Sequence, residues 1–499
     1  MQANGPRPLW WKNCVFYQIY PTSFNDSNDD GIGDISGIAK KLDYLKWLGV
    51  DAIWLSPIYT SPMKDGGYDV ADYIGINPLF GTMDDFDHLL DAAHKLAIRV
   101  LIDWVPNHTS DQHLWFKASR SSRNNPKRDW YIWRDQPNNW LSSIEQSSAW
   151  TYDHSTKQYY LHTFLPQQPD LNWDNPEVVE AMLGVLKFWL DKGVDGFRAD
   201  VINLIAKDEK YADLAPDFIG ADWAHFNHHP KIREYLQKIR VVLDSYAQNP
   251  VIVGELLLQD PTEISTYFGQ SGDLHLVFNY QLAEISWNAD EIQAALRTTQ
   301  TVAGRTKQWP SAVLGNHDLS RLLSRYSSLE KARAAAVLLL TLPGSPFIYA
   351  GDELGLSDAI ITEPVDPGGR DGSRAPIPWG KPPAYGWERT AAIPFPANAE
   401  SANFPTVKAD PQSILHLYKQ LIELRGTSPA LRAGDFELLD VPQGVVGYKR
   451  EKLSILINCT DQTQAYEPLK GAKVILTSHV IQNSQLNELR PNEAVILQN

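Results

Sequence analysis

Between positions 194 and 200 the chain reads Val-Asp-Gly-Phe-Arg-Ala-Asp, a short, mostly apolar run that ends in an arginine and a carboxylate. A bounded apolar run of this length predicts a strand buried on both faces, as the strands of parallel sheets are. Seven other segments have the same character, and they lie at 15–20, 52–56, 99–104, 251–255, 276–279, 312–315 and 346–350. The chain therefore offers eight candidate strands for one parallel sheet.

Segments with apolar residues at three- and four-residue spacing lie between these runs, and that spacing predicts amphipathic helices. Clear examples are 38–48, 83–96, 178–192 and 232–246. Eight alternations of strand and helix predict an α/β fold, a (β/α)8 TIM barrel.

Two regions depart from this alternation. The residues after the third strand are rich in Trp, Asn, Ser and Asp and form a segment too long for an ordinary loop, so we expect an inserted small domain, domain B, at 107–174. The barrel then takes 1–106 and 175–425, including a Pro- and Gly-rich segment at 354–410. Alternating runs at 445–450 and 453–458 predict a C-terminal antiparallel β domain, a β-sandwich, at 426–499.

The chain has 499 residues and a formal net charge of −15. A surface with this average charge repels nucleic-acid backbones and anionic membranes, so we expect neither as a partner. A small neutral molecule suits the charge better, and the many aromatic residues offer flat faces that stack on sugar rings.

Only two cysteines, Cys14 and Cys459, are present, which is too few for a disulfide framework. The first residues show neither the apolar stretch nor the cleavage pattern of a secretory signal. The longest apolar stretch, 334–350, is interrupted by two prolines and a glycine and is too short to span a bilayer. We expect a cytoplasmic protein without a membrane span, either a monomer or a homodimer.

Ionisable side chains follow four of the predicted strands, at the end where a barrel of this kind carries its reacting groups. They are Asp103 and His108 after the third strand, Arg198 and Asp200 at the fourth, Glu255 at the fifth, and His317 and Asp318 after the seventh. Any one of them could equally cap a helix or form a structural ion pair. Their convergence at four strand ends favours chemistry that uses two carboxyl groups, such as glycoside hydrolysis.

These segments resemble the four signature regions of the α-amylase superfamily, glycoside hydrolase family 13. The matching stretches are Asp103-Trp-Val-Pro-Asn-His108, Gly196-Phe-Arg-Ala-Asp200, Gly254-Glu255 and Asn316-His-Asp318. Three further stretches resemble the α-glucosidase and oligo-1,6-glucosidase branch: Asp65-Gly-Gly-Tyr68-Asp69, Gln168-Pro-Asp-Leu-Asn172 and Arg370-Asp-Gly-Ser-Arg374.

The resemblance implies a retaining, exo-acting α-glucosidase that acts on small α-glucosides through a covalent glucosyl-aspartate intermediate. Asp200 is then the nucleophile, Glu255 the acid/base and Asp318 the third carboxylate, which grips sugar hydroxyls. The implied substrate-binding residues are Asp65, Tyr68, His108, Phe164, Arg198, Val201, His317 and Arg370, with Arg374 as a nearby competitor of Arg370. Asp65 and Arg370 would close the pocket beyond the terminal glucose.

The segment from position 26 to 34 carries oxygen-bearing side chains at alternate positions, a pattern that suits a hard cation. It resembles a structural calcium loop of oligo-1,6-glucosidases, which implies the ligands Asp26, Asn28, Asp30, Asp34 and the carbonyl of Ile32. A solvated acidic turn is the alternative. Asp29 stands where the family usually has glycine, which tolerates positive φ more readily.

Three questions stay open at this point. In the resembling branch, valine after the nucleophile, here Val201, is associated with α-1,6 bonds, yet broad α-glucosidases carry it too. Leu256 and Leu257 stand where relatives more often place a polar or aromatic residue. The alternatives to a hydrolase are a glucosyl transferase or isomerase that forms trehalulose or trehalose, and a non-catalytic barrel relative.

Overall fold

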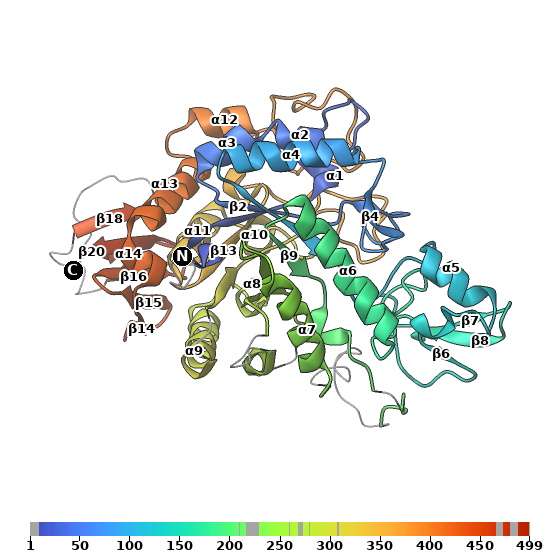
Figure 1. Ribbon diagram of the computed structural model, residues 1–499. Helices are drawn as coiled ribbons and strands as arrows, with labels where there is room; N and C mark the ends of the chain where they lie inside the picture. The colour runs from blue at the N-terminus through green and yellow to red at the C-terminus, as the bar shows by residue number, and fades with distance from the viewer. Residues whose placement is uncertain are drawn as a thin grey trace, which may run out of the picture.

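The computed structural model of the protein describes residues 9–208, 210–215, 229–258, 260–267, 273–278, 280–306, 309–465, 473–479 and 488–498. Its centre is one sheet of eight strands, in the order β11-β10-β9-β5-β2-β1-β13-β12, and every recorded pairing is parallel (Figure 1). The strands are β1 (Phe16–Ile19), β2 (Ala52–Leu55), β5 (Arg99–Trp104), β9 (Gly196–Ala199), β10 (Val251–Gly254), β11 (Leu276–Val277), β12 (Ser311–Val313) and β13 (Ser345–Tyr349).

The two ends of this sheet approach each other, so that it forms a nearly closed barrel. The Ser311 hydroxyl on β12 donates to the Val277 carbonyl on β11 over 2.5 Å. The predicted fold class is confirmed: eight parallel strands form the barrel, and an antiparallel sheet follows at the C-terminus. Glycine is required at Gly196, because a Cβ there would lie 2.3 Å from the Val251 carbonyl oxygen of the neighbouring strand.

Alternate strand residues point to opposite faces of the sheet. One set forms a separate buried cluster that fills the barrel interior and includes Phe16, Trp54, Leu101, Val253 and Phe347. The other set packs with residues of the surrounding helices in the largest buried cluster. Both faces of the strands are therefore dry, which explains their continuous apolar character.

The helices surround the barrel (Figure 1). They are α1 (Pro21–Phe24), α2 (Ile35–Ala39), α3 (Leu42–Leu48), α4 (Met83–Lys95), α6 (Pro176–Lys192), α7 (Ile232–Asp244), α8 (Gln281–Glu284), α9 (Ala289–Thr306), α10 (Leu322–Tyr326), α11 (Leu329–Thr341), α12 (Phe404–Ala409) and α13 (Ile414–Thr427), with 3-10 turns η1 (Trp10–Asn13), η3 (Ile202–Leu204), η5 (Pro261–Tyr267) and η6 (Asp352–Leu354). The helix expected at 38–48 is interrupted, because the Lys41 N–H bonds to the Ile38 carbonyl three residues back and the chain turns before α3.

The segment between β5 and α6 projects away from the barrel (Figure 1). It contains α5 (Leu114–Ser121), η2 (Arg128–Trp130) and a three-stranded antiparallel sheet of β6 (Trp133–Arg134), β8 (Gln158–Leu161) and β7 (Trp150–Asp153). A hairpin of β3 (Tyr59–Thr60) and β4 (Asp72–Ile76) follows β2. The limits given above for the inserted and C-terminal domains stay predictions.

The C-terminal region is antiparallel. Helix α14 (Pro429–Ala433) leads to a sheet of β14 (Phe436–Leu438), β15 (Val445–Arg450), β16 (Leu453–Asn458), β20 (Ala494–Gln498) and β18 (Lys473–Thr477), beside a short pair of β17 (Gln464–Ala465) and β19 (Glu488–Leu489). The buried Arg450 guanidinium donates to the Thr341 carbonyl on α11 over 2.7 Å and so joins this sheet to the barrel. Within the described residues, every helix is too short or too polar to cross a membrane.

Candidate active site

A pocket opens at the C-terminal ends of the barrel strands. It is lined by Asp65, Tyr68, His108, Ile144, Phe164, Asp200, Val201, Glu255, Leu257, Tyr280, Glu284, Asn316, Asp318, Leu319 and Arg370. All three residues predicted as catalytic contribute to this lining, as do six of the predicted substrate-binding residues. The other two, Arg198 and His317, lie directly beneath it and are almost fully buried. The roles assigned to these residues stay predictions.

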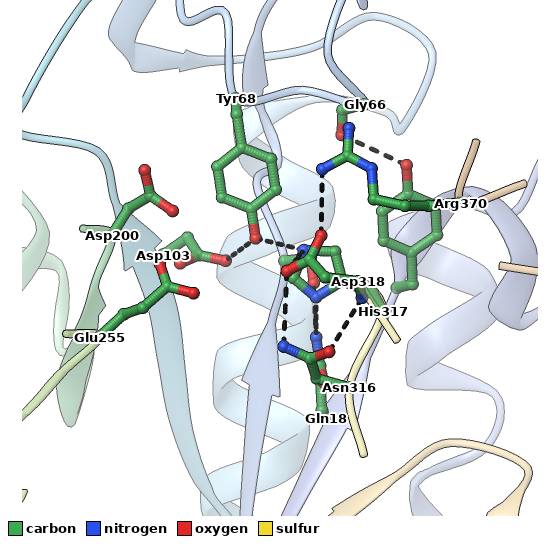
Figure 2. Close-up of polar contacts among 12 residues, drawn as sticks. Gln18, Gly66, Tyr68, Asp103, Asp200, Glu255, Asn316, His317, Asp318 and Arg370 are labelled. Carbon is green, nitrogen blue, oxygen red and sulfur yellow. Dashed lines mark hydrogen bonds and ion pairs between the residues drawn. The ribbon is translucent and has the colours of Figure 1, made fainter. Parts of the chain in front are cut away.

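One guanidinium, that of Arg198, stands among three carboxylates. Its Nη1 lies 2.6 Å from Asp200 and 2.8 Å from Asp103, and its Nη2 lies 2.6 Å from Glu255. Arg198 and Asp200 share one side of the strand because they are two positions apart. Figure 2 shows Asp103, Asp200 and Glu255 converging on one side of Tyr68.

The charges in this group do not balance if every carboxyl group is ionised. Burial raises the pKa of Asp200 well above its ordinary value; Arg198 opposes the rise, and Glu255 and Asp103 reinforce it. Burial likewise raises the pKa of Asp103 to about 6, against the opposing effect of Arg198. One positive charge thus faces three acids in a dry site, where burial favours the uncharged forms of Asp200 and Asp103.

The residue after Asp200 has an unusual backbone conformation. Val201 adopts φ +36° and ψ +43°, the left-handed region that β-branched residues rarely enter. In that conformation its N–H donates to Glu255 Oε2 over 3.1 Å, and the next N–H, of Ile202, donates to the Glu255 carbonyl. The strained turn therefore holds the fourth and fifth strand ends together.

Tyr280 is the other neighbour of Glu255. Its hydroxyl donates to Glu255 Oε1 over 2.8 Å and accepts a hydrogen bond from the Asn316 amide over 3.2 Å. Glu255 thus has Arg198 and Val201 at one oxygen and Tyr280 at the other. Tyr280 follows the sixth strand, so its position carried a signal, but its side chain is uncharged and resembles those of the many tyrosines in the core.

Two arginines hold Asp318 at the opposite side of the pocket. Arg370 Nη1 and Arg374 Nη2 lie 3.1 Å and 3.2 Å from the same oxygen, Oδ1 of Asp318. Burial would raise the pKa of Asp318, but His317, Arg370 and Arg374 outweigh it and lower that pKa well below its ordinary value. Asp318 is therefore ionised throughout the neutral range.

Arg370 also reaches Asp65, and this ion pair walls off one end of the pocket. Asp366, which the sequence did not single out, bridges the two arginines, at 2.7 Å from Arg370 and 3.1 Å from Arg374. Arg370 joins Asp65 to Asp318, while Arg374 contacts Asp318 and lies over the Tyr20 ring, 5.0 Å from its centroid.

His317 lies between two aromatic rings. It stacks on Tyr20 and on Tyr68, with ring centroids 5.8 Å and 5.4 Å away. Gln18 Nε2 lies 2.6 Å from His317 Nδ1, and the Tyr68 hydroxyl lies 2.7 Å from His317 Nε2 (Figure 2). Because Gln18 donates to Nδ1, the proton of the neutral ring is on Nε2 and points to Tyr68. In this structure His317 supports Tyr68 from below.

His108 is held by the side-chain amide of Gln168, for which no role was predicted. Gln168 Nε2 lies 3.1 Å from His108 Nε2 and donates to Asp65 Oδ2 over 2.9 Å. Burial lowers the pKa of His108 to about 4, so the ring is neutral at pH 7. The Phe164 ring packs edge-on against it at 5.2 Å.

The oxygen-rich loop at 26–34 turns its side chains to its own backbone. Asp26 accepts the N–H groups of Asp29 and Gly31, each over 2.8 Å, while Asp30 accepts that of Ile32. Asp34 accepts the Gly37 N–H at the start of α2 over 2.6 Å. Among the described residues, no three His, Cys, Asp or Glu side chains form a group that could hold a metal ion.

Asp29, the departure noted in the sequence, has φ +65°, which aspartate tolerates better than most residues. The loop donors are all oxygens, the type a hard cation needs, and an oxygen that accepts one N–H keeps a further lone pair. Calcium therefore stays a prediction for this loop.

Comparison with known proteins places this geometry in context. The family described as the alpha amylase catalytic domain matches residues 18–434. The chain is 39% identical to a probable alpha-glucosidase of Rhizobium meliloti (strain 1021), with 93% of each chain covered, and 38% identical to an oligo-1,6-glucosidase of Parageobacillus thermoglucosidasius, with 92% of each covered. The trehalulose synthase from Pseudomonas mesoacidophila MX-45 superposes with a TM-score of 0.92 at 32% identity, over 99% of this chain and 100% of that one.

Proposed function

Because this chain belongs to the α-amylase family and is a glycoside hydrolase, we propose that it is a retaining, exo-acting α-glucosidase. It removes terminal α-linked glucose from disaccharides and short oligosaccharides. The observation that carries the proposal is the position of the Arg198 guanidinium, which lies within 2.8 Å of Asp103, Asp200 and Glu255 beneath the pocket. Retaining glycosidases need one ionised and one protonated carboxyl group at the same time.

In the first half of the reaction an Asp200 oxygen attacks the anomeric carbon. The bond from that carbon to the leaving oxygen breaks, and Glu255 gives its proton to the departing oxygen. In the second half Glu255 takes a proton from water, the water oxygen attacks the same carbon, and Asp200 is released. With a glucoside in the pocket, the proton donor is Glu255, which is held by Tyr280 and the Val201 N–H.

The remaining pocket residues bind the glucosyl unit. Asp318, kept ionised by Arg370 and Arg374, accepts hydrogen bonds from sugar hydroxyls and favours the cationic transition state. Neutral His108 and the Tyr68 ring contact the same sugar. The Asp65–Arg370 ion pair leaves room for one glucose beyond the scissile bond, which supports cleavage from the non-reducing end.

A glucosyl transferase or isomerase is the second candidate, and the superposition on trehalulose synthase supports it. The same glucosyl-Asp200 intermediate serves both activities, since a sugar hydroxyl can attack it in place of water. The preference for α-1,4 or α-1,6 bonds is part of the same question, and the oligo-1,6-glucosidase relative favours α-1,6.

Three further proposals concern the whole protein. The loop residues Asp26, Asn28, Asp30, Ile32 and Asp34 bind a calcium ion that stabilises the fold, as their oxygen donors allow. The protein works in the cytoplasm, where its two free thiols, Cys14 and Cys459, stay reduced. It is a monomer or a homodimer, which sedimentation will distinguish.

The test compares wild type, Asp200→Asn and the surface control Asp244→Asn with maltose, isomaltose and sucrose, following glucose and product sugars by chromatography. Wild type and Asp244→Asn should release glucose from at least one sugar, with retention of the anomeric configuration, and Asp200→Asn should not. Isomerised or lengthened sugars without net glucose would establish the second candidate. No turnover of any sugar would reject both and leave the non-catalytic relative.

A further inference from the structure

The pocket has two chemically different halves. Asp65, Arg370, Asp318 and His108 make the glucosyl half polar and charged. Beside Glu255 the lining includes the apolar side chains of Val201 and Leu257, which belong with Phe164 to one hydrophobic cluster. Leaving groups depart toward the acid, because the acid must reach the leaving oxygen. Val201 and Leu257 flank Glu255, so the apolar half is where the leaving group sits.

This apolar half is rigidly built. The Asn203 side chain holds the Leu257 backbone through two reciprocal hydrogen bonds, donating to its carbonyl over 2.9 Å and accepting its N–H over 3.1 Å. Behind the wall, Leu204 on η3 packs in the same cluster with Trp140 and Trp150 of the inserted segment. The shape of the leaving-group side is therefore fixed before substrate arrives.

The polar side chains nearest this wall, Tyr280 and Asn316, already direct their donor hydrogens to acceptors in the protein. The Tyr280 hydroxyl donates to Glu255 and accepts a hydrogen bond from the Asn316 amide. The Asn316 amide also donates to the Asp318 carboxylate, and its oxygen accepts the Asp318 N–H. Glu284, on α8, also lines the pocket and is exposed. A second sugar ring placed here would press its hydroxyls against Leu257 and Val201, and an unpaired buried hydroxyl is unfavourable.

We propose that the leaving-group half of the pocket selects apolar aglycones. The alkyl group of an alkyl α-glucoside binds there more favourably than the polar second sugar of a disaccharide. This inference rests on the proposed function. A methylene buried against Leu257, Val201 and Phe164 gains free energy, whereas a sugar hydroxyl loses its hydration there. Full burial of one methylene corresponds to about a fourfold gain in kcat/KM.

The test is a series of methyl, ethyl, propyl and butyl α-glucosides, whose leaving oxygens differ little in chemistry. For wild type, kcat/KM should rise about two- to fourfold with each methylene. Leu257→Asn should flatten this dependence, because it places an amide on the wall. Val241→Asn, on the outer surface of α7 where Val241 is 71% exposed, should keep it.

A second measurement needs no variant. With maltose as glucosyl donor and equal concentrations of methanol and butanol, wild type should form several times more butyl than methyl α-glucoside. A flat or falling dependence in wild type, with equal transfer to both alcohols, would overturn the inference even though glucose is released. Absence of glucose from maltose and from every alkyl glucoside would instead reject the proposed function itself.

Discussion

The backbone N–H of Val201 donates to the Glu255 carboxylate over 3.1 Å, and it reaches that carboxylate through a left-handed backbone conformation. The first side chain after the proposed nucleophile is thereby fixed beside the proposed acid. Strain of this kind persists where the surrounding structure holds it, here by the Ile202 N–H to the Glu255 carbonyl. The Val201 side chain consequently has a set place on the leaving-group side of the pocket.

Val201→Thr should raise the ratio of kcat/KM for maltose to that for isomaltose, by about threefold. An α-1,6 bond places an additional methylene next to the leaving oxygen, and exchange of a valine methyl for a hydroxyl removes an apolar contact with it. Initial rates with both disaccharides measure the ratio. An unchanged ratio would mean that the Val201 side chain does not determine the preference between α-1,4 and α-1,6 bonds.

Arg198→Met should lower stability and abolish turnover. Removing the guanidinium leaves three buried acids without a counter-charge, and breaking a buried ion pair in this way costs about 3–5 kcal/mol. Arg198 opposes the rise in the pKa values of Asp103 and Asp200, so without it the ionisation of these two acids opposes folding more at high pH. The fall in melting temperature should therefore be larger at pH 8 than at pH 5.

Lys238→Met is the matched control for that variant. It breaks an exposed pair with Glu234 on α7 and should shift the melting temperature little at either pH. Equal losses for Arg198→Met at both pH values would show that Arg198 contributes packing and not charge.

Arg370→Ala should open the closed end of the pocket. Asp65 loses its ion-pair partner and Asp318 loses one of its two arginines, so kcat/KM for maltose should fall at least a hundredfold. With maltotetraose the early products should shift from glucose plus maltotriose toward maltose, because a second glucose then fits beyond the scissile bond. If glucose and maltotriose remain the sole early products, another part of the pocket sets the exo action.

Asp352→Asn should reduce the stability that the folded protein loses as the pH rises. Burial raises the pKa of Asp352 to about 7; Arg321 and Arg325 oppose the rise and Glu353 and Asp358 add to it. For an acid whose folded pKa is raised, the stabilising form is the protonated one, so stability is lost as pH rises from about 4 through 7. The whole effect is about 4 kcal/mol.

The measurement is the melting temperature of wild type and Asp352→Asn at pH 5 and pH 8. The variant should gain on wild type at pH 8 relative to pH 5. A constant difference would show that Asp352 ionises in the folded protein as readily as in the unfolded chain.

Calcium should raise the melting temperature of chelator-treated protein by a few degrees. A ligand at a hundred times its dissociation constant stabilises the native state by about 2.7 kcal/mol, and the shift per kcal/mol is small for a large chain. Asp30→Ala should lose this response, because Asp30 is a proposed ligand and its exposed side chain holds only the Ile32 N–H. Equal melting temperatures with chelator and with calcium would reject the site.

Strand positions were predictable because both faces of each strand are buried, which makes every run apolar; acids such as Asp200 and Glu255 stood out where those runs stop. Asp366 gave no such signal, since it lies in an aperiodic loop and acquires its role only when that loop folds over Asp318. Gln168 likewise became important only through its two neighbours from distant parts of the chain. The burial of His317 beneath Tyr68 depends on three-dimensional stacking, which spacing along the chain does not encode.

The ion pair between Asp65 and Arg370 joins residues that are 305 positions apart in the chain. A ribosome adds about 5–20 residues per second, so roughly 15 to 60 seconds separate the synthesis of the two partners. Late in that interval the nascent protein already carries Asp200 and Glu255 but has no closed end at which a terminal glucose can be bound. The ability to cleave sugars therefore arises late in biosynthesis, and a chain whose translation stops before Arg370 is released without it.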